Sequence, residues 1–204
     1  MNGSSEERGW SAYYARTGSR PPRETLVFAL DRFDSEPGDA PRLAVDLGAG
    51  SGRDAIEMLR RGWRVFAVDA EADAIDALTH RPDLPAGADV LGMVARFEDA
   101  DWPECALVNS SFALPLCAPA DFARVWQRIR STLLLGGRFA GQLCGDRDSW
   151  AGRDGMTFHN RTEVESLLAG FEVERLDEEE DDSVTPRGEA KHWHIFHIVA
   201  RRPG

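Results

Sequence analysis

One ten-residue segment, VDLGAGSGRD at residues 45–54, narrows the folds open to this chain more than any other feature. Its three glycines, Gly48, Gly50 and Gly52, follow an apolar run and precede a helical pattern. Glycine adopts backbone conformations closed to other residues and lets a ligand approach the main chain. Such a turn between a strand and a helix is typical of α/β proteins that bind nucleotide cofactors.

Short apolar runs alternate with helical patterns along most of the chain. Strands are expected at residues 42–48, 63–70, 91–98, 106–112 and 138–145, and helices at 22–33, 52–62, 71–80 and 120–137. This alternation predicts an α/β fold, in which a mostly parallel sheet is covered by helices.

The end of the chain departs from that alternation. A short helix is expected at residues 161–170, followed by strands at 171–177 and 192–202 that no helix separates. Two such strands should pair as an antiparallel hairpin at a sheet edge. The acidic run LDEEEDDS, residues 176–183, is expected to be a solvated loop between them.

Charge and hydropathy exclude several classes of protein. A formal net charge of −11 argues against nucleic acid as the main partner, because phosphate binding needs an excess of basic residues. No run approaches the roughly 20 apolar residues of a membrane span, and residues 1–8 lack the apolar core of a signal peptide. The three cysteines form no disulfide framework, so a reduced, cytoplasmic protein is expected.

The spacing of the glycines bears on the ligand. Dinucleotide-binding turns space their glycines GxGxxG, whereas here the third glycine comes one residue earlier. No Gly-Lys-Ser/Thr follows, which excludes a P-loop. Asp46, two residues before the first glycine, would repel a pyrophosphate and attract an ammonium or sulfonium group. The turn therefore favours a cationic ligand, with a nicotinamide-dependent oxidoreductase as the less favoured alternative.

With its surroundings, VDLGAGSG resembles the first motif of class I S-adenosylmethionine-dependent methyltransferases. Asp69, which ends the strand VFAVDA, matches the acid that binds both ribose hydroxyls in that family. The resemblance implies a Rossmann-like fold with a seven-stranded, mostly parallel sheet, an antiparallel last strand and helices on both faces. It implies S-adenosylmethionine as cofactor, held by Trp10, Tyr14, Arg20, Asp46, Gly48, Ala49, Gly50, Gly52, Asp69, Ala70, Phe97, Glu98, Asn109 and Ser110.

In its small size and in the style of its sequence, the chain also resembles the tellurite-resistance-type and trans-aconitate-type small-molecule methyltransferases. In this comparison Trp10 and Tyr14 form a lid over the cofactor, or simply cap the core, and Arg20 pairs with the cofactor carboxylate. A single domain over residues 1–204 is expected. Its parts are a lid and extra helix (1–33), a cofactor-binding core (42–145) and a substrate-side loop, helix and C-terminal hairpin (146–204).

The favoured function is methyl transfer to a small molecule by in-line displacement, by a monomer or homodimer. His159 and His192 are candidate bases, and Phe112, Asp146, Arg147 and Trp150 are candidate substrate residues, although the last three could equally order their loop.

His192, His194 and His197 are expected on one face of the last strand, too far apart to hold one metal ion, so no metal is expected. Two alternatives remain open: a cofactor-binding partner or regulator that does not methylate, and S-adenosylmethionine chemistry other than methyl transfer.

Overall fold

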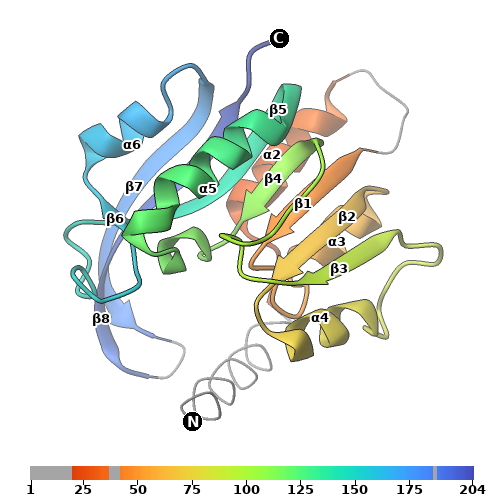
Figure 1. Cartoon of the computed structure of the whole chain (residues 1–204), viewed down its shortest axis with the longest axis horizontal. Coiled ribbons are helices and arrows are strands. Elements are labelled where there is room, and N and C mark those ends of the chain that lie inside the picture. Colours follow the sequence, from red (N-terminus) through yellow and green to blue (C-terminus); the bar gives the residue numbers. More distant parts are fainter. Residues whose placement is uncertain (1–19, 37–41, 186–187) are drawn as a thin grey trace.

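A twisted, mostly parallel sheet forms the centre of the computed structural model, which describes residues 20–36, 42–185 and 188–204 (Figure 1). Seven strands follow the order β3-β2-β1-β4-β5-β8-β7, and the two-residue strand β6 pairs with β5 outside this path. The strands are β1 (Leu43–Leu47), β2 (Arg64–Asp69), β3 (Val90–Val94), β4 (Cys105–Ser110), β5 (Leu133–Gly145), β6 (Phe158–His159), β7 (Glu172–Val184) and β8 (Ala190–Arg201). In the described sheet, β8 is antiparallel to both of its neighbours, β5 and β7, and all the other pairings are parallel. This arrangement confirms the predicted fold class.

Helices cover both faces of the sheet. They are α2 (Glu24–Asp34), α3 (Ala55–Arg60), α4 (Ala72–Thr79), the short 3-10 helix η1 (Leu114–Leu116), α5 (Pro119–Thr132) and α6 (Arg161–Leu167). Figure 1 shows α5 and α6 in front of the sheet and α2 and α3 behind it. None of the helices in the described ranges is long and apolar enough to cross a membrane.

Strand β1 supplies side chains to two separate hydrophobic cores. Val45 and Leu47 pack in the core under α5 and α6, whereas Ala44 packs in the core under α2, α3 and α4. Alternate residues of a strand face opposite sides of a sheet, so a central strand with both faces covered is apolar almost throughout. Asp46 is the exception in β1, and it is 2% exposed.

The order of the strands determines where a ligand can bind. The chain builds outward from β1 to β2 and β3, then returns to place β4 on the other side of β1. At such a switch the connections leave the sheet in opposite directions, and a crevice opens beyond the carboxyl ends of the strands. The glycine turn follows β1 at this position.

The helix predicted over residues 120–137 is wrong at its end. Helix α5 stops at Thr132, and Leu133 already has the extended backbone of β5. Leu133 lies opposite Cys105 in the register with β4, and its carbonyl oxygen accepts a hydrogen bond from Arg202. These contacts with distant residues override the helical spacing that Leu133 shares with Ile129.

The prediction of a loop for the acidic run at residues 176–183 is also wrong. The run forms more than half of strand β7. Its backbone pairs with β8 from Leu176 opposite Ile198 to Ser183 opposite Lys191. Arg147, from the loop after β5, donates to Glu178 at 2.8 Å and to Glu180 at 2.9 Å. Opposite charges and cross-strand pairing offset the repulsion between the acidic residues, and the side chains from Asp177 to Ser183 are exposed as expected.

A buried arginine ties three elements together far from the glycine turn. The Arg138 side chain of β5 is 2% exposed and pairs with Glu36 at 2.6 Å and with Glu174 at 2.7 Å. Its guanidinium group also lies 4.4 Å from the centre of the Phe33 ring. These contacts join the end of α2 to β5 and β7.

We therefore expect Arg138→Met to lower the free energy of unfolding by about 3 kcal/mol, since removing one member of a buried ion pair leaves uncompensated charge. Urea unfolding followed by circular dichroism measures this change. Arg60→Met is the control, because the Arg60–Asp83 pair is exposed and should contribute less than about 1 kcal/mol. Equal losses in the two variants would contradict a structural role for Arg138.

Candidate functional site

The glycine turn has a backbone path that requires its three glycines. Gly48, Gly50 and Gly52 have φ angles of 73°, 53° and 85°, in the left-handed region that side chains disfavour. The N–H groups of Gly48 and Ala49 both donate to the carbonyl oxygen of Val68, at 2.8 and 3.1 Å. The turn is thus held against the end of β2.

Two of these glycines also leave no room for a side chain. A Cβ atom added to Gly48 would lie 2.2 Å from the Cβ of Ala113, and one added to Gly52 would lie 2.3 Å from Cδ1 of Leu78. The first contact brings the loop after β4 directly against the turn. The second packs the turn on α4.

Asp69 connects the end of β2 to the turn through its carboxylate. Its Oδ2 accepts a hydrogen bond from the N–H of Gly50 at 2.7 Å, and its Oδ1 accepts one from the N–H of Glu71 at 3.0 Å. Asp69 is 6% exposed, whereas the following Ala70 is exposed. Two backbone donors therefore orient a carboxylate at the carboxyl edge of the sheet.

A second pair of buried acids lies beside the turn. Asn109 Nδ2 donates to Oδ1 of Asp46 at 2.8 Å and to Oδ2 of Asp54 at 3.3 Å, and Arg23 N–H donates to Oδ1 of Asp54 at 2.9 Å. Burial, followed by the charge of Asp54, raises the pKa of Asp46 well above its ordinary value. Asp46 Oδ2 and Asn109 Oδ1 are buried and have no hydrogen-bond partner among the residues that the structure describes.

The sequence prediction omits Asp54 from the site. Its position at the start of α3, directly after the glycine turn, is the signal that could have identified it as a site residue. Ser110, which was singled out, donates its hydroxyl to the carbonyl oxygen of Leu47 at 3.1 Å.

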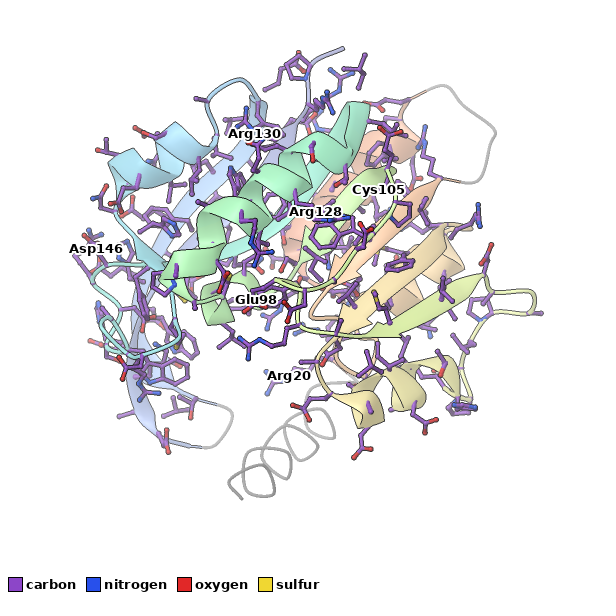
Figure 2. The ribbon with its side chains drawn as sticks, viewed as in Figure 1. Arg20, Glu98, Cys105, Arg128, Arg130 and Asp146 are labelled. Atoms are coloured by element: carbon purple, nitrogen blue, oxygen red, sulfur yellow. The ribbon has the colours of Figure 1, made fainter. Side chains whose placement is uncertain are left out.

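The expected adenine side lies beyond β3. Glu98 is buried and pairs with Arg96 at 2.7 Å, and the half-buried Phe97 packs against the core under α5. In Figure 2, Glu98 lies beyond the strand ends near the middle of the molecule, with Arg20 below it. Arg20 is exposed, and Trp10 and Tyr14 lie outside the described residues.

The expected substrate residues fall into two groups. Phe112, half-buried, follows β4 next to the turn, and the guanidinium group of Arg23 lies 4.2 Å from the centre of its ring. Asp146, Arg147 and Trp150 instead belong to the loop after β5, at the left of Figure 2, where Arg147 binds β7. These three residues have contacts that order the loop against the hairpin.

That loop is anchored by a buried ion pair that the sequence did not reveal. Lys191 and Asp148 pair with no side-chain exposure, and the ammonium group lies 4.1 Å and 4.3 Å from the ring centres of Trp150 and Trp193. Asp148 also accepts a hydrogen bond from the N–H of Trp150 at 2.8 Å.

The two candidate bases differ in environment. His159 is 8% exposed, its Nδ1 has no hydrogen-bond partner, and burial lowers its pKa. His192 lies between Asp182 at 2.8 Å and Glu180 at 3.1 Å, and these carboxylates raise its pKa. The structure thus gives His159 an uncharged ring and gives His192 the environment of a cross-strand ion pair.

The prediction that three histidines share one face of the last strand is wrong. His192 and His194 lie opposite Asp182 and Glu180 in the register, whereas His197 lies opposite Asp177. Residues three apart in a strand point to opposite faces, and His197 bonds Glu179 instead. Within the described ranges, no group of three acidic, histidine or cysteine side chains is arranged to hold a metal ion.

Residues 44–137 match a family model described as a methyltransferase domain. No curated protein matches the chain. The match to this family model extends from β1 to the start of β5 and includes the glycine turn, Asp69 and the loop after β4.

Solved structures share the fold at low sequence identity. TehB from Haemophilus influenzae has a TM-score of 0.77 at 14% identity; the match covers 93% of this chain, which spans 65% of that one. The 1,6-didemethyltoxoflavin-N1-methyltransferase of Burkholderia thailandensis, with bound 1,6-didemethyltoxoflavin and S-adenosylhomocysteine, has a TM-score of 0.66 at 20% identity, covering 98% and 85%. Magnesium protoporphyrin IX methyltransferase of Synechocystis PCC 6803, with bound S-adenosylmethionine, has a TM-score of 0.67 at 13% identity, covering 95% and 91%.

The close packing of the turn leads to a prediction about Gly48. Gly48→Ala should lower the free energy of unfolding by about 3 kcal/mol, because a left-handed alanine costs about 1–2 kcal/mol and the clash with Ala113 adds about 1–3 kcal/mol. Gly62→Ala is the matched control: its φ is 78°, and no atom lies within 4 Å of the added Cβ. Thermal unfolding compares the two, and similar losses would show that Ala113 gives way.

Proposed function

We infer from the match of residues 44–137 to a methyltransferase-domain model, and from the fold shared with solved structures, that this chain is a class I, S-adenosylmethionine-dependent methyltransferase. We propose that the chain transfers a methyl group from S-adenosylmethionine to a small-molecule acceptor. The observation that carries this proposal is the Asp69 carboxylate, held against the turn by the Gly50 N–H at the switch point of the sheet.

The residues present suit this cofactor. A carboxylate with two oxygens at the edge of the sheet matches a ribose with two neighbouring hydroxyl groups. Asp54 and Asp69 add buried carboxyl groups near the turn, which favour a ligand that carries positive charge.

We assign the binding roles as follows. Asp69 would hold the ribose, Phe97 and Glu98 would border the adenine, and the turn with Asn109 and Ser110 would face the methionine part. Arg20 and the segment before α2 would close the site. Two solved structures of similar fold are methyltransferases named for small molecules, 1,6-didemethyltoxoflavin and magnesium protoporphyrin IX, which supports a small acceptor here.

When bound, S-adenosylmethionine supplies an electrophilic methyl group on a sulfonium. The task left to the chain is to align the acceptor in line with that group and to exclude water. Ala113 lies against the turn, and with the neighbouring Phe112 it would form the wall that does so.

His159 is the side chain that we propose as a proton acceptor for a hydroxyl or amine substrate. Its ring is buried against Phe122, at a centroid distance of 4.6 Å, and its Nδ1 has no hydrogen-bond partner. Because burial lowers its pKa, the ring stays neutral at physiological pH and is ready to take a proton. His192 is already hydrogen-bonded to two carboxylates and suits this role less well.

Cofactor binding gives the first test of this function. Calorimetry with S-adenosylhomocysteine should show binding to the wild type and a loss of at least about tenfold for Asp69→Ala, since two charge-assisted hydrogen bonds disappear. Asp73→Ala, an exposed acid in the first turn of α4, should bind like the wild type. Equal affinities in all three proteins would contradict the role of Asp69.

Proton transfer gives a second test, measured as S-adenosylhomocysteine formation with an acceptor found by screening. His159→Gln should lower kcat by about 10²-fold or more if the acceptor must lose a proton. The base works unprotonated, so the wild-type rate should fall only as the pH drops through a pKa below the ordinary 6.5. A wild-type acidic limb that persists unchanged in His159→Gln would exclude this role.

A further inference from the structure

Phe112 has a backbone conformation that an aromatic residue rarely adopts. Its φ is 58°, and within the described ranges it is the sole residue other than glycine with a positive φ. Such a conformation persists only where the surrounding structure holds it, and it often occurs at functional sites.

A buried chain of hydrogen bonds ends on the backbone of Phe112. Its N–H donates to Oε1 of Gln142 at 3.2 Å, and Nε2 of Gln142 donates to Oγ1 of Thr25 at 2.8 Å. Gln142 and Thr25 are each 1% exposed. Gln142 comes from the middle of β5 and Thr25 from the first turn of α2, so two separate elements fix this point of the loop.

The ring of Phe112 is held as well. The Arg23 guanidinium lies 4.2 Å from its centre, and the His197 ring meets it edge-on at 6.3 Å. The backbone of Arg23 is in turn fixed, because its N–H donates to Asp54 at the start of α3.

Phe112 is also close to the proposed cofactor site. Ala113, its neighbour in sequence, occupies the space that a side chain at Gly48 would need. On its other side, Ser110 donates its hydroxyl to the carbonyl oxygen of Leu47, the last residue of β1. The strained residue therefore lies between two contacts with the glycine turn and the strand before it.

We propose that Gln142 and Thr25 are positioning residues that hold Phe112 in its left-handed conformation, so that its ring borders the methyl group to be transferred. This inference rests on the proposed function. It assigns the specificity of the methyl side to a wall whose position is set by β5 and α2.

A double-mutant cycle tests the positioning role without any ligand. Gln142→Leu should lower the Tm by about 3 °C or more. If Gln142 holds a strained residue, this loss should be larger by about half or more in a Phe112→Gly background, because glycine adopts a positive φ without strain and no strain is then released to offset the lost hydrogen bond. An equal loss in both backgrounds would mean that Gln142 only satisfies buried polar groups, and would overturn the proposal.

Cofactor affinities test the effect on the methyl side. S-adenosylmethionine differs from S-adenosylhomocysteine by the methyl group and the positive charge of the sulfonium. The ratio of their Kd values therefore measures how well the wall at Phe112 accommodates the methyl group. Gln142→Leu and Thr25→Val should raise the Kd for S-adenosylmethionine about fivefold and leave that for S-adenosylhomocysteine within about twofold. Thr25→Ser, which keeps the hydroxyl, should retain the wild-type ratio.

Gln127→Leu is the matched control, since Gln127 is exposed on α5. If Gln142→Leu and Thr25→Val leave the ratio of the two Kd values unchanged, including the case in which both ligands bind equally more weakly, the inference is overturned. A wild-type protein that binds neither ligand would instead overturn the proposed function, and the double-mutant cycle would still decide whether Gln142 holds Phe112.

Discussion

The hydrogen bond from the Gly50 N–H to the Asp69 carboxylate, 2.7 Å long, sets the geometry on which the rest of the site depends. It fixes the turn after β1 to the end of β2, while Asn109, near the end of β4, donates a hydrogen bond to Asp46 in β1. Three adjacent strands thus end in a cross-linked edge rather than in independent loops. Because β1 is the strand at which the order reverses, this edge coincides with the crevice in which open α/β sheets bind ligands.

Much of this architecture is predictable from sequence because its causes are local. Apolar runs of five or six residues identify β1, β2 and β4, and the turn glycines stand where the backbone needs a positive φ. The closing hairpin follows from two strands without a helix between them. Asp69 is predictable too, because the end of a strand at the carboxyl edge is a fixed place in this kind of sheet.

The remainder depends on partners distant in sequence. The acidic run becomes part of β7 because Arg147, about 30 residues earlier, binds Glu178 and Glu180. The contact between Thr25 and Gln142 spans 117 residues, and a sequence shows only that a glutamine interrupts an apolar strand. Leu133 follows the helical pattern of α5 yet pairs with Cys105. Periodicity predicts elements, but it does not tell which element a side chain will meet.

A crystal structure with S-adenosylhomocysteine would show whether the turn and Asp69 form a cofactor site. We expect density with both ribose hydroxyls within about 2.5–3.0 Å of the Asp69 carboxylate oxygens and the amino-acid part against the glycine turn. Density for the ligand at any other place, or an empty turn in crystals grown at saturating ligand, would contradict this expectation.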